Sequence, residues 1–137
     1  MEQPKKQALN RNLAYIEETA KSNGWLFKYD EKLDELYWSK PTISSDTKLI
    51  KLTDDFAFYI KPSGEIEGIF IEYAKFNFFA HEKSLKELLS IVESTDHLKT
   101  EELSVDLMKK FTDRVKAEAI EVASFNNVLE IFKTRTV

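Results

Sequence analysis

Hydrophobic and polar residues alternate along residues 54–73, on both sides of a Pro-Ser-Gly turn. Alternation with a period of two is typical of strands that bury one face. Pro62 suits the second position of a type I turn, and Gly64 suits the left-handed residue that follows it. The pattern therefore predicts a β-hairpin with a three-residue loop.

The turn also predicts a register for this hairpin. The expected pairs are Lys61 with Glu65, Ile60 with Ile66, Phe58 with Gly68, and Phe56 with Phe70. This register would place Phe56, Phe58, Ile60, Ile66 and Phe70 on one face, with Gly68 leaving room for the ring of Phe58. The other face is polar near the turn and apolar at its far end, so we expect another element to pack there.

Other segments extend the expected sheet. Residues 25–29 and 35–39 are rich in aromatic residues and flank the polar turn DEKLD, which predicts a second antiparallel hairpin. Residues 48–52 form a short strand candidate after a loop rich in Pro, Ser and Asp. The sequence thus predicts an antiparallel β-meander of four or five strands over about residues 25–75.

Helical periodicity lies on both sides of the meander. Residues 6–22 carry an apolar stripe that ends at Asn23-Gly24. A capping box formed by Ser84 and Glu87 begins a second helix. We predict an α+β fold with an N-terminal helix and, over about residues 84–133, two C-terminal helices packed on the sheet.

The last apolar stripe is long. Leu103, Leu107, Phe111, Val115, Ala119 and Val122 recur at three or four residues, and Phe125, Val128, Leu129 and Phe132 continue the rhythm. It predicts one helix to about Lys133, or two if the poor helix formers at residues 124–127 break it. A helix of about 30 residues would span roughly 45 Å, more than a domain of this size needs.

This excess length indicates self-association. The residues assigned to a contact with a second copy are Leu107, Phe111, Val115, Val122, Leu129 and Phe132. The alternative is that the same stripe folds back on the sheet of its own chain.

Composition narrows the class of protein. The chain has 137 residues, 42% of them hydrophobic and 32% charged, which predicts a single domain over residues 1–137 that is neither disordered nor membrane-like. The absence of Cys excludes disulfides and thiolate sites. The N-terminus lacks the pattern of a signal peptide, and no segment approaches the roughly 20 apolar residues of a membrane span. We therefore expect a cytoplasmic protein.

A net charge of −4, with acids and bases interspersed, argues against nucleic-acid binding.

The sequence offers no catalytic constellation. His81 and His97 lack the second His, one helical turn away, that a zinc hydrolase motif requires. The acids of the DEKLD turn, including Asp30 and Asp34, are expected to bond to their own backbone and shape the hairpin. There is no nucleophile elbow and no phosphate-binding glycine loop. We predict a non-enzyme without cofactor or metal.

The aromatic residues leave two interpretations open. Trp25, Phe27, Tyr37 and Trp38 lie in the first predicted hairpin, and Phe76, Phe78 and Phe79 follow the second. Such a set fills the core of a small sheet efficiently, because each ring buries a large area. The same set is also suited to lining a pocket for an apolar ligand.

Two segments, YDEKLDELYW and GEIEGIFI, resemble a short prokaryotic domain of unknown function, number twenty-two eighty-three. The matching residues are Tyr29, Asp30, Asp34, Leu36, Tyr37, Gly64, Ile66, Gly68, Ile69 and Ile71. The resemblance covers about residues 27–75 and is carried mostly by turn and core residues. Because genes of that family often look like companions of small toxin-like proteins, the resemblance implies an antitoxin-type role.

These observations predict a non-catalytic protein-interaction module that forms a homodimer through residues 103–132. Two alternatives remain. One is an antitoxin-type partner of a small toxin protein, whose C-terminal segment would fold on its partner. The other is a binder of a small apolar ligand on the aromatic sheet face.

Overall fold

An antiparallel sheet forms the centre of the fold in the computed structural model of the chain, which describes residues 11–80, 83–95 and 97–121. Its strands among these residues are β1 (Leu26–Asp30), β2 (Glu35–Ser39), β3 (Lys48–Lys51), β4 (Phe56–Ile60), β5 (Ile66–Glu72) and β6 (Leu98–Lys99). They lie in the order β3-β4-β5-β2-β1-β6, and each neighbouring pair is antiparallel.

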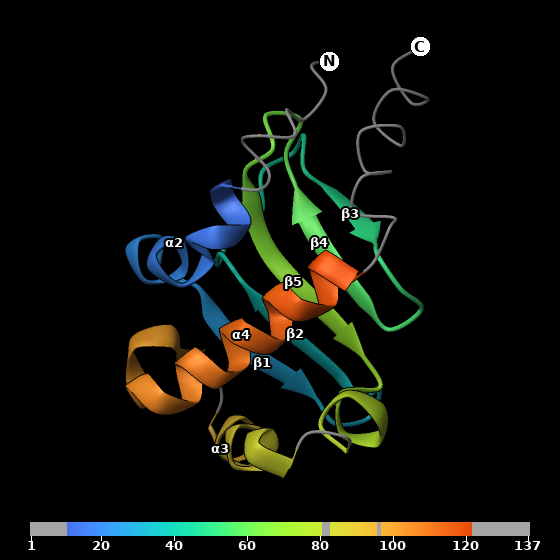
Figure 1. The fold of residues 1–137 in the computed structure, drawn as a ribbon, viewed down its shortest axis with the longest axis vertical. Helices are drawn as coiled ribbons and strands as arrows, with labels where there is room; N and C mark the ends of the chain where they lie inside the picture. Colours follow the sequence, from blue (N-terminus) through green and yellow to red (C-terminus); the bar gives the residue numbers. More distant parts are fainter. Residues whose placement is uncertain (1–10, 81–82, 96, 122–137) are drawn as a thin grey trace.

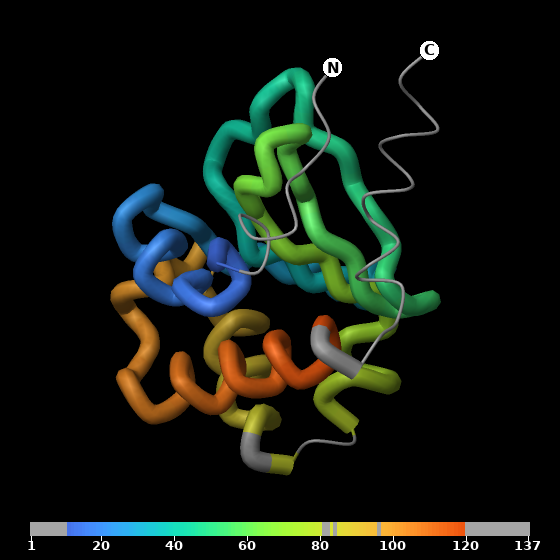
Figure 2. Tube along the Cα trace, turned by 45° about the horizontal axis from the view of Figure 1, so that its top comes forward, coloured from blue at the N-terminus to red at the C-terminus, as the bar shows by residue number. Residues whose placement is uncertain are grey.

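The α-helices of the described part gather on one face of this sheet (Figure 1), and Figure 2 shows the same arrangement from a second direction. They are α2 (Ile16–Ser22), α3 (Lys86–Ser94) and α4 (Val105–Glu121). Shorter helical turns connect the elements: η1 (Ala74–Phe78), η2 (Lys83–Leu85) and η3 (Thr100–Glu102). Residues 11–14 are also helical, so the described part of the predicted N-terminal helix is present, interrupted at Tyr15.

The predicted α+β class is confirmed, but the count and order of the strands differ from the prediction. The additional strand, β6, lies in a segment expected to be a polar link, because two residues are too few to show an alternating pattern. The order is not that of a simple meander, since β2 pairs with β5 and the connection to β3 crosses two strands.

The predicted capping box at Ser84 is also wrong. Helix α3 begins at Lys86 with Leu85 as its N-cap, after a turn of 3-10 helix.

The predicted β4–β5 hairpin is confirmed, but its register is wrong beyond the turn. Lys61 donates its backbone N–H to Glu65 at 2.9 Å, Gly64 has a φ of 93°, and Ile60 pairs with Ile66 as expected. Tyr59 then pairs with Gly68, because β5 carries one extra residue, Glu67. This β-bulge shifts the remaining pairs by one position. Phe70 consequently pairs with Ala57 and faces away from Phe56 and Phe58.

The helix-covered face of the sheet forms the core. The register lines up one row of buried side chains across all the described strands: Ile50, Phe58, Ile69, Trp38, Phe27 and Leu98. Helix α4 packs on this row through Phe111, whose ring centroid lies 5.4 Å from those of Phe27 and Trp38. A buried hydrogen-bond chain joins the row to the η3 turn, because Trp38 Nε1 donates to Thr100 Oγ1, which donates to the carbonyl of Trp25.

Candidate functional site

The face of the sheet opposite the helices is the candidate site, and we call it the open face. The strand register arranges its side chains in three rows. The first row is Leu49, Tyr59, Gly68, Ser39, Leu26 and Lys99. The second is Lys51, Ala57, Phe70, Tyr37 and Lys28, and the third is Glu72, Glu35 and Asp30.

Aromatic side chains occupy the centre of the open face. The rings of Tyr37 and Phe70 lie opposite each other on β2 and β5, with their centroids 4.9 Å apart. Tyr59 lies in the neighbouring row, half-buried, and Leu49 beside it on the edge strand is 43% exposed. The β-bulge creates this centre, because without it Phe70 would point into the core. Phe70 itself is only 7% exposed, so Tyr37, Tyr59 and Leu49 supply the exposed part of this centre.

A hollow of about 450 Å³ lies beside the aromatic centre, over β1 and β2. It is lined by Leu26, Lys28, Asp30, Tyr37, Ser39, Lys40, Pro41 and His97. A second hollow, of about 340 Å³, shares Leu26 and Pro41 with the first and reaches Gly24, Trp25 and Lys99. Their size falls in the range of pockets that hold small ligands or side chains of a partner.

Three acidic residues form one row of the open face, and its lysines lie in the other two rows. Glu72, Glu35 and Asp30 are direct cross-strand neighbours at one end of the strands, an arrangement in which like charges repel. Lys51 compensates only Glu72, at 3.3 Å. Lys28 and Lys99 lie instead along the β1–β6 side of the face.

Tyr37 connects the aromatic centre to the acidic row. Its hydroxyl donates a hydrogen bond of 2.9 Å to Glu35 Oε1. Burial and this hydrogen bond to a carboxylate raise the pKa of Tyr37 to about 12, and burial raises the pKa of Tyr59 as well. Both hydroxyls therefore remain protonated at neutral pH and serve as hydrogen-bond donors rather than as bases.

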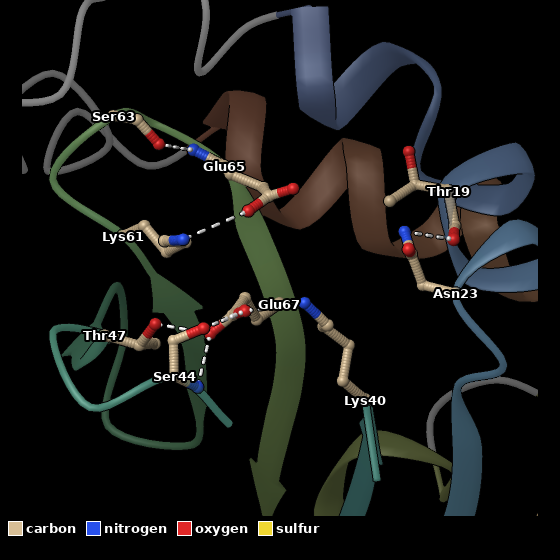
Figure 3. A network of polar contacts seen from close by, with 9 residues as sticks. All are labelled: Thr19, Asn23, Lys40, Ser44, Thr47, Lys61, Ser63, Glu65 and Glu67. Carbon is tan, nitrogen blue, oxygen red and sulfur yellow. Dashed lines mark hydrogen bonds and ion pairs between the residues drawn. The ribbon is translucent and has the colours of Figure 1, made fainter. Parts of the chain in front are cut away.

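Glu67 anchors the loop that crosses the end of the sheet from β2 to β3 (Figure 3). Its carboxylate is fully buried and accepts hydrogen bonds from Lys40 Nζ at 2.8 Å, from the backbone N–H of Ser44 at 3.0 Å and from the hydroxyls of Ser44 and Thr47. Burial raises the pKa of the Glu67 carboxyl, but these hydrogen bonds outweigh it and lower the pKa to about 2. The bulge directs the Glu67 side chain toward the loop. Because its carboxylate accepts hydrogen bonds from Lys40, Ser44 and Thr47, it holds the loop beside the open face and is not a catalytic base.

Asp34 anchors the opposite end of the sheet. It has a φ of 54°, and its carboxylate accepts the Tyr29 hydroxyl at 2.6 Å and the backbone N–H groups of Lys75 and Phe76 at 2.7 and 3.0 Å. From the residues that the structure describes, the Asp30 carboxylate accepts one hydrogen bond, from the backbone N–H of Leu33 at 3.2 Å. Burial and the hydrogen bond to Asp34 raise the pKa of Tyr29. These contacts are those expected of acids that shape a turn, and Asp34 additionally ties that turn to η1.

The structure describes three of the six residues that the sequence predicts to form a contact with a second copy. Leu107, Phe111 and Val115 are buried and pack in the core of their own chain, as the alternative interpretation of the stripe expects for them. Val122, Leu129 and Phe132 lie outside the described residues. Self-association through this stripe therefore stays a prediction that depends on the latter three.

The aromatic centre of the open face was not predicted from the sequence. The predicted register placed Phe70 in the core, so the aromatic side chains of the other face were not recognised as a group. The informative signal is the uninterrupted apolar run Ile69-Phe70-Ile71, which is typical of a strand buried on both faces. Of the aromatic residues considered as pocket lining, Trp25, Phe27, Trp38, Phe78 and Phe79 are buried in the core, whereas Tyr37 lines the larger hollow.

Within the described ranges, no helix has the length and apolar character to cross a lipid bilayer. The same residues contain no group of three or more His, Asp and Glu side chains arranged to bind a metal ion. Comparison of the chain with protein-family models, with curated proteins and with solved structures found no match. The resemblance to the domain of unknown function, and the antitoxin-type role that it implies, stay predictions.

Proposed function

We propose that this chain is a non-catalytic protein-interaction module and that it binds through its open face. The observation that carries this proposal is the aromatic centre formed by Tyr37, Tyr59 and Phe70 on a sheet face that no described helix covers. Tyrosine and phenylalanine are enriched at protein interfaces, and each buries a large area with few rotatable bonds.

The surroundings of the aromatic centre support the same function. The Glu67 and Asp34 networks fix the two ends of the sheet, so the face is rigid before a partner arrives and loses little conformational entropy on binding. The charged rim and the two shallow hollows match the polar border and side-chain pockets of known interfaces. The C-terminal stripe, through Val122, Leu129 and Phe132, is a second proposed contact.

Site-specific photo-crosslinking tests the function. A benzoylphenylalanine replaces Tyr59 on the open face or, as the matched control, Tyr15, which is 59% exposed at the helical interruption before α2. In the cells that produce the protein, irradiation should give a discrete covalent adduct with protein from position 59 and none from position 15. The absence of an adduct at position 59, or equal adducts at both positions, would contradict the proposal.

A further inference from the structure

Strand β3 is the last strand at one edge of the sheet (Figure 1). One side of it pairs with β4, and among the described residues no strand pairs with its other side. Leu52, directly after β3, donates its backbone N–H to the carbonyl of Phe56 at 2.8 Å. Because hydrogen-bonded and non-hydrogen-bonded pairs alternate along an antiparallel ladder, Ile50 also turns its backbone groups toward β4, and Leu49 and Lys51 turn theirs outward.

The pairing of β4 with β5 gives the same direction. Glu72 donates its backbone N–H to the carbonyl of Asp55 at 2.8 Å, so the odd-numbered residues of β4 turn their backbone groups toward β5 and the even-numbered ones toward β3. The outer edge of β3 thus carries four backbone groups, the N–H and C=O of Leu49 and Lys51. The described chain supplies no hydrogen-bond partner for any of the four.

The side chains of β3 restrict which strand can pair with this edge. Leu49 lies on the open face beside Tyr59 and is 43% exposed, so it extends the apolar centre of that face to the edge of the sheet. Lys48 and Lys51 are the charged residues of β3, and Lys48 makes no ion pair with a described residue. Lysine on an edge strand discourages pairing with strands in general. It favours a strand that places acids opposite it, because opposite charges attract across a strand pair.

We propose that an extended, acidic segment of the partner protein adds to the sheet as a strand antiparallel to β3. This inference rests on the proposed function, because the added strand is the part of the partner that meets the edge of the open face. The four outward backbone groups identify the occupant as a strand, since only an extended chain at strand spacing satisfies them together. The antiparallel direction is that of each described strand pair in the sheet.

The register of β3 gives the expected pattern of the added strand. An acidic residue lies opposite Lys51, an apolar residue opposite Leu49 and a second acidic residue opposite Lys48. The position opposite Ile50 falls on the helix-covered face and is not restricted by charge. From its N-terminal end, the segment therefore reads acid, any residue, apolar residue, acid.

Proline at position 51 tests this inference, because it removes an outward N–H and leaves the pairing with β4 intact. Lys51→Thr, the matched control, removes the same side chain and its ion pair with Glu72 but keeps the N–H. Benzoylphenylalanine in place of Leu49 detects the added strand by photo-crosslinking in the cells that produce the protein. Lys51→Pro should lower the yield of the adduct about tenfold or more. Lys51→Thr should keep it within about threefold, because the exposed ion pair contributes little.

Thermal unfolding of the purified variants separates loss of binding from loss of folding. The melting temperature of Lys51→Pro should lie within about 5 °C of that of Lys51→Thr, because an edge strand tolerates proline where the N–H faces outward. Ile50→Pro removes an N–H directed at β4 and should lower the melting temperature by about 10 °C or more. A Lys51→Pro protein as unstable as Ile50→Pro would show that Lys51 faces β4, which overturns the inference.

Mass spectrometry of the adduct identifies the occupant. A segment of another protein with the expected acidic pattern, joined to position 49 and lost in Lys51→Pro but not in Lys51→Thr, supports the inference. An adduct from position 59 with none from position 49, or an adduct from position 49 that Lys51→Pro leaves unchanged, overturns the inference while the proposed function survives. A second copy of this chain joined through its own β3 also overturns it, because β3 contains no acid. The absence of an adduct at both positions contradicts the inference and the proposed function together.

Discussion

The rings of Phe70 and Tyr37 face each other across β5 and β2, 4.9 Å apart, on the side of the sheet away from the helices. This relationship exists because Glu67 is an extra residue in β5 and shifts every later pair of the β4–β5 hairpin by one position. One bulge thus moves the aromatic side chain of Phe70 from the helix-covered face to the open face, where it is 7% exposed, and supplies the buried carboxylate that fixes the β2–β3 loop. The aromatic centre of the open face and the anchored β2–β3 loop therefore have the same structural origin.

The bulge leads to a prediction for Gly68. A Cβ atom at this position would lie 2.8 Å from the Cα atom of Ser39 and closer still to its Cβ atom. We expect Gly68→Ala to lower the free energy of unfolding by about 3 kcal/mol, because β2 and β5 must separate. Urea denaturation measures this change.

Two further variants serve as controls for Gly68. Gly24→Ala meets no atom within 4 Å but has a φ of +66°, so it should cost only about 1 kcal/mol. Ser39→Gly removes the nearest obstructing atom and should recover part of the stability lost in Gly68→Ala. Equal losses at the two glycines would contradict the close strand approach.

The lowered pKa of Glu67 predicts that the free energy of unfolding falls as the pH is lowered. Its pKa is about 2 in the folded protein against the ordinary 4.5, so its contribution is complete above about pH 5 and is lost as the pH falls from there toward 2. A lowering of the pKa of this size contributes on the order of 3 kcal/mol to the free energy of unfolding at neutral pH.

Thermal unfolding of the wild type and of Glu67→Gln between pH 7 and pH 2.5 measures this contribution. The amide nitrogen of Gln would face donors at Lys40, Ser44 and Thr47, so the variant should be less stable at pH 7. The two melting temperatures should converge as the pH falls toward 2.5. A gap that stays constant over this range would show that the charge of Glu67 does not support the loop.

Much of the fold was predictable from local sequence, and the site was not. The Pro62–Gly64 turn and the β1–β2 hairpin follow from alternation and turn chemistry, which act over a few residues. The extra residue at Glu67 depends on contacts with a loop more than twenty residues away, and β6 depends on pairing with a strand more than seventy residues away. Such long-range contacts override local pattern, so the register beyond Ile60 and the composition of the open face required the structure.

Asp34 should matter more than the other acid of its turn. Asp34→Asn keeps a residue that tolerates the positive φ, but its amide nitrogen would oppose one of the donors at Tyr29, Lys75 and Phe76. We expect it to lower the free energy of unfolding by about 2 kcal/mol. Asp30→Asn, the matched control, affects one backbone hydrogen bond and should cost about 0.5 kcal/mol. Urea denaturation in which both variants lose equal stability would contradict the role of Asp34 in joining the turn to η1.

The described half of the C-terminal stripe should behave as core. Phe111 is fully buried against Phe27 and Trp38, so Phe111→Ala should lower the free energy of unfolding by about 4 kcal/mol in urea denaturation. Lys109→Ala, at an exposed position on the same helix, should change it by no more than about 0.5 kcal/mol. A Phe111→Ala protein as stable as the wild type would show that α4 does not pack on the sheet.

Radical footprinting of the open face tests the central claim most directly. Oxidation of Tyr37, Tyr59 and Leu49 is compared between dilute purified protein and the protein inside its own cells, with Phe76, 83% exposed at η1, as the internal reference. We predict that the three open-face residues are oxidised several-fold less in cells, while oxidation of Phe76 does not change. Equal oxidation of Tyr37, Tyr59 and Leu49 in both settings would show that nothing binds this face and would contradict the account.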